Sequence, residues 1–181
     1  MGKNGTNNEV TLKALETIAE EIALQETKAI DYFVSAVGNG SNVLGVGRAF
    51  PKTTKVIAFE TVQSAVLYDL KFPGEYEQRF GIPHGKLPRH SLPGTSYQGI
   101  DFPHIRNAAS LVDDVVLLSD ASLDKAYTAR TGKHDTEQLP HWDKVEQFSD
   151  VGRTTHAALA VALEIAETVT QKIFLLLDMI K

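Results

Sequence analysis

The sequence has no cysteine, so it can form no disulfide bond and offers no thiolate for catalysis or metal binding. It contains no apolar run near the roughly 20 residues that cross a bilayer, and its polar start, MGKNGTNNE, lacks the apolar core of a secretion signal. Basic residues number 18 against 23 acidic ones, a formal net charge of −5. These absences favour a cytoplasmic protein and give no electrostatic reason to expect nucleic acid or a membrane as a partner.

The chain has the size and composition of one folded domain. Its 181 residues are 43% hydrophobic, enough for a sizeable buried core. Residues 1–9 are polar and are expected to form a disordered leader, with a single α/β domain over residues 10–181.

Short apolar runs alternate with helical patterns along most of the chain. Helices are predicted over residues 11–26, 41–50, 63–70, 119–130, 143–148 and 157–169, strands over 30–37, 55–60, 114–118 and 172–178, and a polar loop over 131–137. Strands that are nearly continuous apolar runs are typical of a parallel sheet buried on both faces. The pattern therefore predicts a three-layer α/β sandwich, in which a mainly parallel sheet of about four strands is covered by helices on both faces.

Residues 71–104 interrupt this alternation. The segment carries five of the seven prolines, at positions 73, 83, 88, 93 and 103, and glycines at 74, 81, 85, 94 and 99. A connection of this length inside a compact domain is usually a binding loop, a lid or a surface excursion. We expect a loop that borders a site or a neighbouring subunit, and a plain surface excursion fits equally well.

The central motif is a glycine loop between the first strand and the following helix. Residues 38–42 read Gly-Asn-Gly-Ser-Asn. The first amides of a helix lack partners and carry partial positive charge, which makes such a turn a natural phosphate site. The glycines would let the backbone approach an anion, while Ser41 and Asn42 would add side-chain hydrogen bonds and cap the helix. An ordinary strand-to-helix turn that binds nothing is the alternative.

Six segments follow one another along the chain: DYFVSAVGNGSNVLGVGRAF, VIAFE, LPGTSYQGIDFPHI, VDDVVLL, VGRTTHAALAVALEIAE and KIFLLLD. In this order they resemble the C-terminal half of pyridoxal-phosphate enzymes of the cysteine synthase and tryptophan synthase β type. The resemblance covers about residues 12–178. It implies pyridoxal 5′-phosphate as cofactor and the β-elimination or β-replacement chemistry of lyases and transferases in amino-acid metabolism.

The resemblance also implies which residues bind the cofactor. The family's Gly-Thr-Gly-Gly-Thr phosphate loop matches Gly38, Asn39, Gly40, Ser41 and Asn42, and its hydroxyl-bearing turn near the pyridine nitrogen matches Thr154 and Thr155. Gly94 and Thr95 match a run that lines the cofactor. Arg153 and His156 depart from the pattern, and His156 is expected to be a capping or surface imidazole.

Two functional parts of the family have no counterpart in this sequence. The lysine that holds the cofactor and the Ser/Thr-Gly-Asn loop that grips the substrate carboxylate belong to the family's N-terminal half. The resemblance therefore implies that this chain is the phosphate-binding portion of an enzyme and does not turn over alone. Its implied partners are a small amino-acid substrate, the missing N-terminal half and further copies of the chain.

Two other functions stay open from the residues. A dinucleotide-binding domain is indicated by Gly38-x-Gly40 and by Glu60 at the end of the next strand, but Val43 stands where the third glycine belongs. The second open function is a non-catalytic module that oligomerises. No metal site is expected, because His134, Asp135, Glu137, His141 and Asp143 lack metal-binding spacing.

Overall fold

A computed structural model of the chain describes residues 8–83, 86, 94–95, 102–118, 128–130, 135–136, 145 and 150–176. Its elements are α1 (Glu9–Gln25), β1 (Tyr32–Ala36), α2 (Ser41–Ala49), β2 (Lys55–Thr61), α3 (Val66–Lys71), α4 (Glu75–Phe80), α5 (Pro103–Ala108), β3 (Asp114–Leu118), β4 (Thr128–Arg130), β5 (Asp135–Thr136), α7 (Arg153–Ala166) and β6 (Phe174–Leu176). A single 3₁₀ turn, Val62–Ser64, joins β2 to α3.

The strands form one sheet in the order β5-β4-β3-β2-β1-β6. Strands β3, β2, β1 and β6 run parallel to one another. Val34 of β1 lies opposite both Ile57 of β2 and Leu176 of β6. β4 and β5 extend the β3 edge in antiparallel fashion. The expected mainly parallel sheet is therefore confirmed, with two short antiparallel strands added at one edge.

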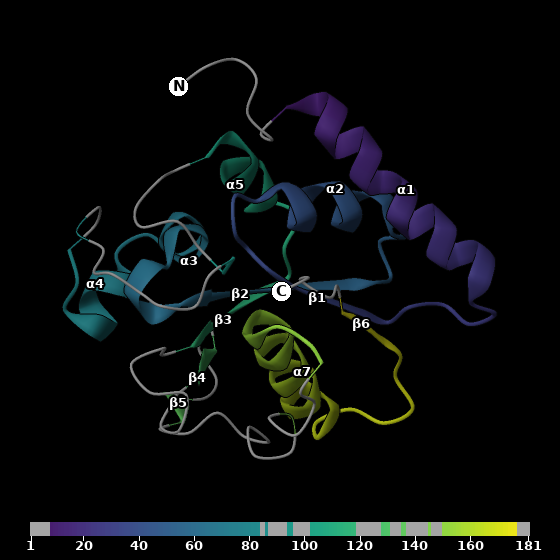
Figure 1. Cartoon of the computed structure of the whole chain (residues 1–181). Helices are drawn as coiled ribbons and strands as arrows, with labels where there is room; N and C mark the ends of the chain where they lie inside the picture. Colours follow the sequence, from purple (N-terminus) through teal and green to yellow (C-terminus); the bar gives the residue numbers. More distant parts are fainter. Residues whose placement is uncertain are drawn as a thin grey trace.

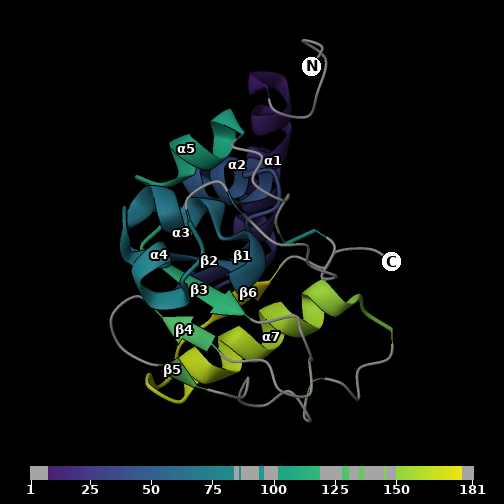
Figure 2. The ribbon, with the colours of Figure 1, turned by 90° about the vertical axis from the view of Figure 1, so that its left-hand side faces the viewer.

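Helices cover both faces of the sheet (Figure 1). α1 to α5 lie on one face and α7 lies on the other, and a view turned by 90° shows the same layers from the side (Figure 2). The side chains of β1 alternate between two cores, because successive strand residues point to opposite faces: Phe33 belongs to the core under α2, and Val34 to the core against α7. The three-layer prediction is confirmed.

The first helix is held at its start by a side-chain cap and along its length by α2. Asn8 Oδ1 accepts a hydrogen bond from the Thr11 amide at 3.0 Å, so α1 begins two residues before the predicted position. Arg48 of α2 pairs with Glu9 at 2.7 Å and also with Glu16. The two helices approach closely at Gly45, where an added Cβ would lie 2.7 Å from Leu15 Cβ.

Two aspartates link neighbouring strands at the amino edge of the sheet. Asp31, just before β1, accepts from the Ile173 amide at 3.0 Å and pairs with Lys172 at 2.7 Å. Asp113, just before β3, accepts from the Val56 amide at 2.9 Å and pairs with Lys55 at 2.8 Å. Each carboxylate thus accepts a hydrogen bond from a backbone amide at the start of the neighbouring strand and also pairs with a lysine there.

The segment expected to be one long loop, residues 71–104, contains helix α4 and the first two residues of helix α5. α4 lies between two left-handed glycines, Gly74 with φ +86° and Gly81 with φ +65°. α5 begins with Pro103, whose ring fixes the dihedral angle a first helical residue needs. Both helices have six residues, too short to show a helical period, which explains why the sequence pattern missed them.

Two further predictions are wrong at the β3 edge of the sheet. Thr128–Arg130 was expected to end a helix and is instead strand β4, and Asp135–Thr136 was expected in a loop and is strand β5. The open edge of β3 supplies backbone partners, and these override local helix preference.

The leader and the helix expected over 143–148 lie almost entirely outside the described residues. Within the described ranges, no helix is long and apolar enough to cross a membrane.

Replacing Gly45 by alanine should destabilise the fold, because the new methyl group would meet the Leu15 side chain and, at 3.2 Å, the Leu12 carbonyl oxygen. We expect a loss of roughly 1–3 kcal/mol in the free energy of unfolding, measured by urea denaturation. Gly47→Ala is the matched control on the same helix, because its nearest contact, at 3.1 Å, is the movable end of Leu111. Equal losses in both variants would contradict this packing.

Candidate functional site

The glycine loop lies at the carboxyl edge of the sheet, where β1 ends and α2 begins. From β1 the chain passes over one face through α2 to β2, whereas β6, on the other side of β1, is reached through α7 on the opposite face. Helices that leave toward opposite faces create a crevice at the carboxyl ends of the two strands. In open α/β sheets this switch point is the usual position of a ligand site.

The two glycines of the loop are required by the chain's own packing. Gly38 has φ +53° and Gly40 has φ +84°, a region that residues with a Cβ rarely adopt. A Cβ on Gly38 would lie 3.0 Å from the Gly94 carbonyl oxygen, and one on Gly40 would lie 2.5 Å from the Ile105 amide nitrogen. The space beside the glycines is thus filled by residues 94–95 and by α5.

Several amides of the loop already have acceptors within the protein. The Gly38 amide donates to the Thr95 carbonyl at 2.7 Å and the Gly40 amide to the Val37 carbonyl at 2.7 Å. The Ser41 amide donates to Asn39 Oδ1 at 3.0 Å. The amides of the next two residues, Asn42 and Val43, find no acceptor within the described part of the chain.

The start of α2 differs from its prediction in one respect. Ser41 and Asn42 were expected to cap the helix, but Gly40 occupies the cap position and Ser41 is the first helical residue. The Asn39 side chain takes over the capping role by accepting from the Ser41 amide. Because left-handed Gly40 already occupies the cap position, Ser41 and Asn42 both lie within the helix.

The hydroxyl of Ser41 contacts a histidine from α5. Ser41 Oγ lies 3.0 Å from His104 Nδ1, and Ser41 is 5% and His104 4% exposed. Burial lowers the pKa of His104; the Glu9 carboxylate opposes this shift and the Arg48 guanidinium adds to it. The imidazole is therefore held neutral at neutral pH.

Thr154 and Thr155 lie in the first turn of α7, at the same edge of the sheet as the glycine loop. α7 leads back to parallel strand β6, so its first turn lies at the carboxyl ends of the strands. Both threonines are buried. His156, expected to be a capping or surface imidazole, is buried as well, three residues after the start of α7.

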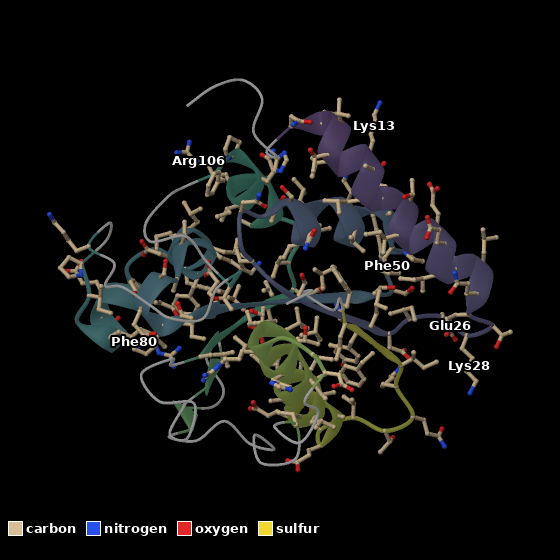
Figure 3. All side chains as sticks on the ribbon, in the orientation of Figure 1. Lys13, Glu26, Lys28, Phe50, Phe80 and Arg106 are labelled. Atoms are coloured by element: carbon tan, nitrogen blue, oxygen red, sulfur yellow. The ribbon has the colours of Figure 1, made fainter. Side chains whose placement is uncertain are left out.

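The lysines whose partners are described lie away from the glycine loop. Lys55 and Lys172 form their ion pairs at the amino edge of the sheet. Lys71 donates to the Val112 carbonyl at 2.6 Å, close to the start of β3. Lys13 projects outward from α1, and Lys28 lies beyond the end of that helix (Figure 3). None of these five lies at the carboxyl edge with the loop.

The Glu60 carboxylate is buried and hydrogen-bonded within the fold, so it cannot bind a ribose in this structure. It is fully buried at the end of β2, and its two oxygens accept from the amides of Leu67 and Tyr68, both at 3.0 Å. Burial raises the pKa of Glu60 to about 8, although those two amides favour the charged form. The interpretation of Glu60 as a strand-end carboxylate agrees with these contacts, and the dinucleotide hypothesis loses its acidic residue.

The structure brings Gly94 and Thr95 against the loop and adds His104, which the sequence gave no reason to select; that Gly94 and Thr95 line a cofactor stays a prediction. A histidine in a proline- and glycine-rich segment carries no periodic or motif signal. Its role depends on α5 packing against the start of α2, a contact between residues 63 positions apart.

The comparisons with known proteins agree with this geometry. The family model described as pyridoxal-phosphate dependent enzyme matches residues 3–176, nearly the whole chain. The fold is an open α/β sheet with a glycine loop at its carboxyl edge. The family match covers nearly all of it, so the chain belongs to the pyridoxal-phosphate dependent enzyme family. Curated protein sequences gave no significant match.

Solved structures show the same fold at low identity. An O-ureido-L-serine synthase superposes with a TM-score of 0.64 at 20% identity, over 94% of this chain and 46% of its own. An O-acetylserine dependent cystathionine β-synthase from Helicobacter pylori gives 0.62 at 16%, over 93% and 47%. An O-acetyl serine sulfhydrylase isoform from Entamoeba histolytica gives 0.61 at 22%, over 97% and 45%. This chain spans less than half the length of each.

The residues at the loop fit the phosphate group that this family's cofactor carries. The amides of Asn42 and Val43 are available donors in the first turn of a nine-residue helix. The aligned peptide dipoles place partial positive charge at the same point. The loop segment, residues 38–42, contains no acidic side chain that would repel an anion.

Glu60 should make the stability of the fold fall as pH rises. Its folded-state pKa of about 8 lies above the usual value of 4.5, so the folded state binds more protons than the unfolded state between these limits. Stability should therefore drop by on the order of 3 kcal/mol between pH 5 and pH 8.

The measurement is urea unfolding at several pH values, with Glu60→Gln as the test variant. The variant has no titrating carboxyl group and should lose this fall, while Glu77→Gln, at an exposed position of α4, should keep it. A profile in Glu60→Gln that still falls as the parent does would contradict the assignment.

Proposed function

We propose that this chain is the phosphate-binding portion of a pyridoxal-phosphate-dependent enzyme that catalyses β-elimination or β-replacement on an amino acid, in the manner of cysteine synthase. The observation that carries the proposal is the family match over residues 3–176 together with the glycine loop at the carboxyl end of β1. The structural similarity to enzymes named for serine-derived substrates supports a related substrate class.

The anchoring of the cofactor phosphate is assigned to residues 38–42. Asn42 and Val43 supply backbone donors, and Ser41 supplies a hydroxyl at the helix start. Charge at a helix N-terminus favours an anion by typically 0.3–1 kcal/mol when exposed and up to about 2 kcal/mol when partly buried. Gly38, Asn39 and Gly40 shape the turn, since their own contacts hold it in one conformation.

The remaining site residues line the cofactor ring. Thr154 or Thr155, in the first turn of α7, is proposed to place a hydroxyl near the pyridine nitrogen. Gly94 and Thr95 are proposed to form one wall, because they contact the loop through the Gly38 amide and the Gly94 carbonyl. Both assignments follow the family pattern, and the positions at the carboxyl edge support them.

Catalysis in this family needs a cofactor-binding lysine and a loop that grips the substrate carboxylate, and the resemblance gives neither a counterpart in this sequence. When bound, the cofactor withdraws electrons from the amino acid and makes its Cα proton acidic. This chain binds the phosphate, orients the ring and covers one side of the cleft. We assign the proton transfer and the grip on the substrate carboxylate to an N-terminal half, so the chain alone is inactive and acts in the cytoplasm as part of a larger enzyme.

Pyridoxal 5′-phosphate and inorganic phosphate should both bind weakly at the start of α2. In amide spectra of the ¹⁵N-labelled chain, we expect the shifts of Asn42 and Val43 to move with either ligand, while amides at the amino edge, such as Val56, stay in place. No absorbance band of a lysine-bound cofactor should develop. A stable yellow protein would contradict the inactive state, and shifts caused only by NADH would favour the dinucleotide alternative.

Self-association is a second proposed property, favoured by two exposed apolar side chains on α1. Val10 is 79% and Leu24 is 88% exposed, and fourteen residues of helix place them on nearly the same face. A hollow of about 240 Å³ lies between the end of α1 and residues 50–51, lined by Ile22, Ile30 and Phe50 among others.

Light scattering tests this assembly. The parent chain should form a dimer or larger species, and the double change of Val10 and Leu24 to serine should shift it toward monomer because two apolar contacts are lost. Glu20→Ser and Glu21→Ser, at exposed positions of the same helix, are the control. A parent chain that is monomeric at all concentrations would exclude the proposed assembly.

A further inference from the structure

One face of α1 points away from the rest of the described chain. Its residues recur at alternating spacings of four and three, which aligns them along a single side of a helix. They are Val10, Ala14, Thr17, Glu21 and Leu24, and all five are exposed. The opposite side of α1 packs against α2, and α1 lies at the outer margin of the molecule (Figure 1). This outward face of α1 is therefore open to another molecule.

The apolar residues of the outward face are placed symmetrically about its middle. Val10 and Leu24, the large hydrophobic side chains that the described part of the chain exposes, each lie seven residues from Thr17. Ala14 is small, and the Thr17 hydroxyl donates to the Ala14 carbonyl at 2.8 Å within the helix. Another helix can therefore approach the middle of this face closely without leaving that hydroxyl unpaired.

The charges that border the outward face differ between its two halves. Lys13, in the first half, projects outward (Figure 3), and Glu20 and Glu21 lie in the second half. All three are exposed, at three or four residues from Thr17. Glu9, at the start of the helix, is paired with Arg48 of α2. The outward face thus carries positive charge toward its start and negative charge toward its end.

This charge distribution matches a second copy of the same helix in one orientation. If two copies run antiparallel, with Thr17 against Thr17, Lys13 of each copy lies opposite Glu20 and Glu21 of the other. If they run parallel and in register, like charges lie opposite one another. Arrangements that place like charges together are disfavoured, so charge selects the antiparallel pair.

We propose that the outward face of α1 is a self-complementary surface, on which a second copy of this chain docks antiparallel about Thr17. The inference rests on the proposed self-association and specifies its surface and orientation. Val10 of each copy packs against Leu24 of the other, and the two-fold axis passes between the Thr17 side chains.

The apolar contacts supply the affinity of this pair, and the charges set its direction. Exposed ion pairs add little to affinity, so neutralising a glutamate, as in Glu20→Ser, changes the association little, whereas reversing a charge introduces repulsion. The 17 residues of α1 span about 25 Å. A contact of this length lies at the low end of interface sizes, so we expect a reversible dimer.

Crosslinking tests the orientation, because a cysteine introduced into this cysteine-free chain is its single thiol. Under mild oxidation, Thr17→Cys should form a disulfide-linked dimer, since the two copies of position 17 meet. Val10→Cys alone should not, because its two copies lie about 21 Å apart along antiparallel helices. Mixed Val10→Cys and Leu24→Cys chains should crosslink to each other. Glu77→Cys, at an exposed position of α4, measures crosslinking by random collision.

Charge reversal tests the complementarity by light scattering. Lys13→Glu should weaken the association about fivefold, and so should the double change Glu20→Lys and Glu21→Lys, because each creates two repulsive contacts per dimer. An equal mixture of these two variants should restore the association as mixed dimers. Lys52→Glu, at an exposed position after α2, changes the net charge as Lys13→Glu does and should associate like the parent.

The outcomes separate this surface from self-association itself. Val10→Cys chains that crosslink to themselves as readily as Thr17→Cys chains would overturn the antiparallel orientation, as would charge-reversed variants whose mixture stays dissociated. A parent chain that associates while no cysteine on α1 crosslinks above the Glu77→Cys level would overturn α1 as the surface and leave self-association intact. A parent chain that stays monomeric would overturn both.

Discussion

The site depends on a close backbone contact between the turn after β1 and two segments from later in the chain. Gly38 and Gly40 adopt left-handed conformations and have no side chain, so the backbone of residues 94–95 and of the start of α5 contacts the turn directly. This contact buries Ser41, brings His104 to it and sets the direction of α2. Without it, the first amides of the helix would have no fixed position at the edge of the sheet.

The two edges of the parallel sheet differ in their chemistry. The amino edge carries solvent-facing ion pairs, in which Asp31 and Asp113 each join a strand start to a lysine. The carboxyl edge instead holds buried polar groups: Glu60, Ser41, His104, Thr154 and Thr155. Because buried polar groups must be paired, this edge is more constrained, and it is the edge where helix dipoles favour an anion.

The chain belongs to the pyridoxal-phosphate dependent enzyme family, and it spans less than half the length of the similar solved structures. The fold is shared with solved structures at 16–22% identity, and the glycine loop of this chain reads Gly-Asn-Gly-Ser-Asn. The conformation of this loop depends on two left-handed glycines and on the start of a helix. The side chains between the glycines and the helix are less constrained. Asn39 illustrates this, since its side chain caps the helix that follows.

The sequence by itself determined the parallel sheet, its helical layers and the place of the glycine loop, because continuous apolar strands and a glycine turn before a helix are local patterns. It also indicated that Glu60 ends a strand. Only the tertiary structure decided that His104 meets Ser41, that Glu60 caps α3, and that residues 128–130 form a strand. The first depends on a partner far away in the chain and the third on an open sheet edge. The second depends on the turn that brings the start of α3 back to the end of β2. Short-range periodicity carries no information about any of the three.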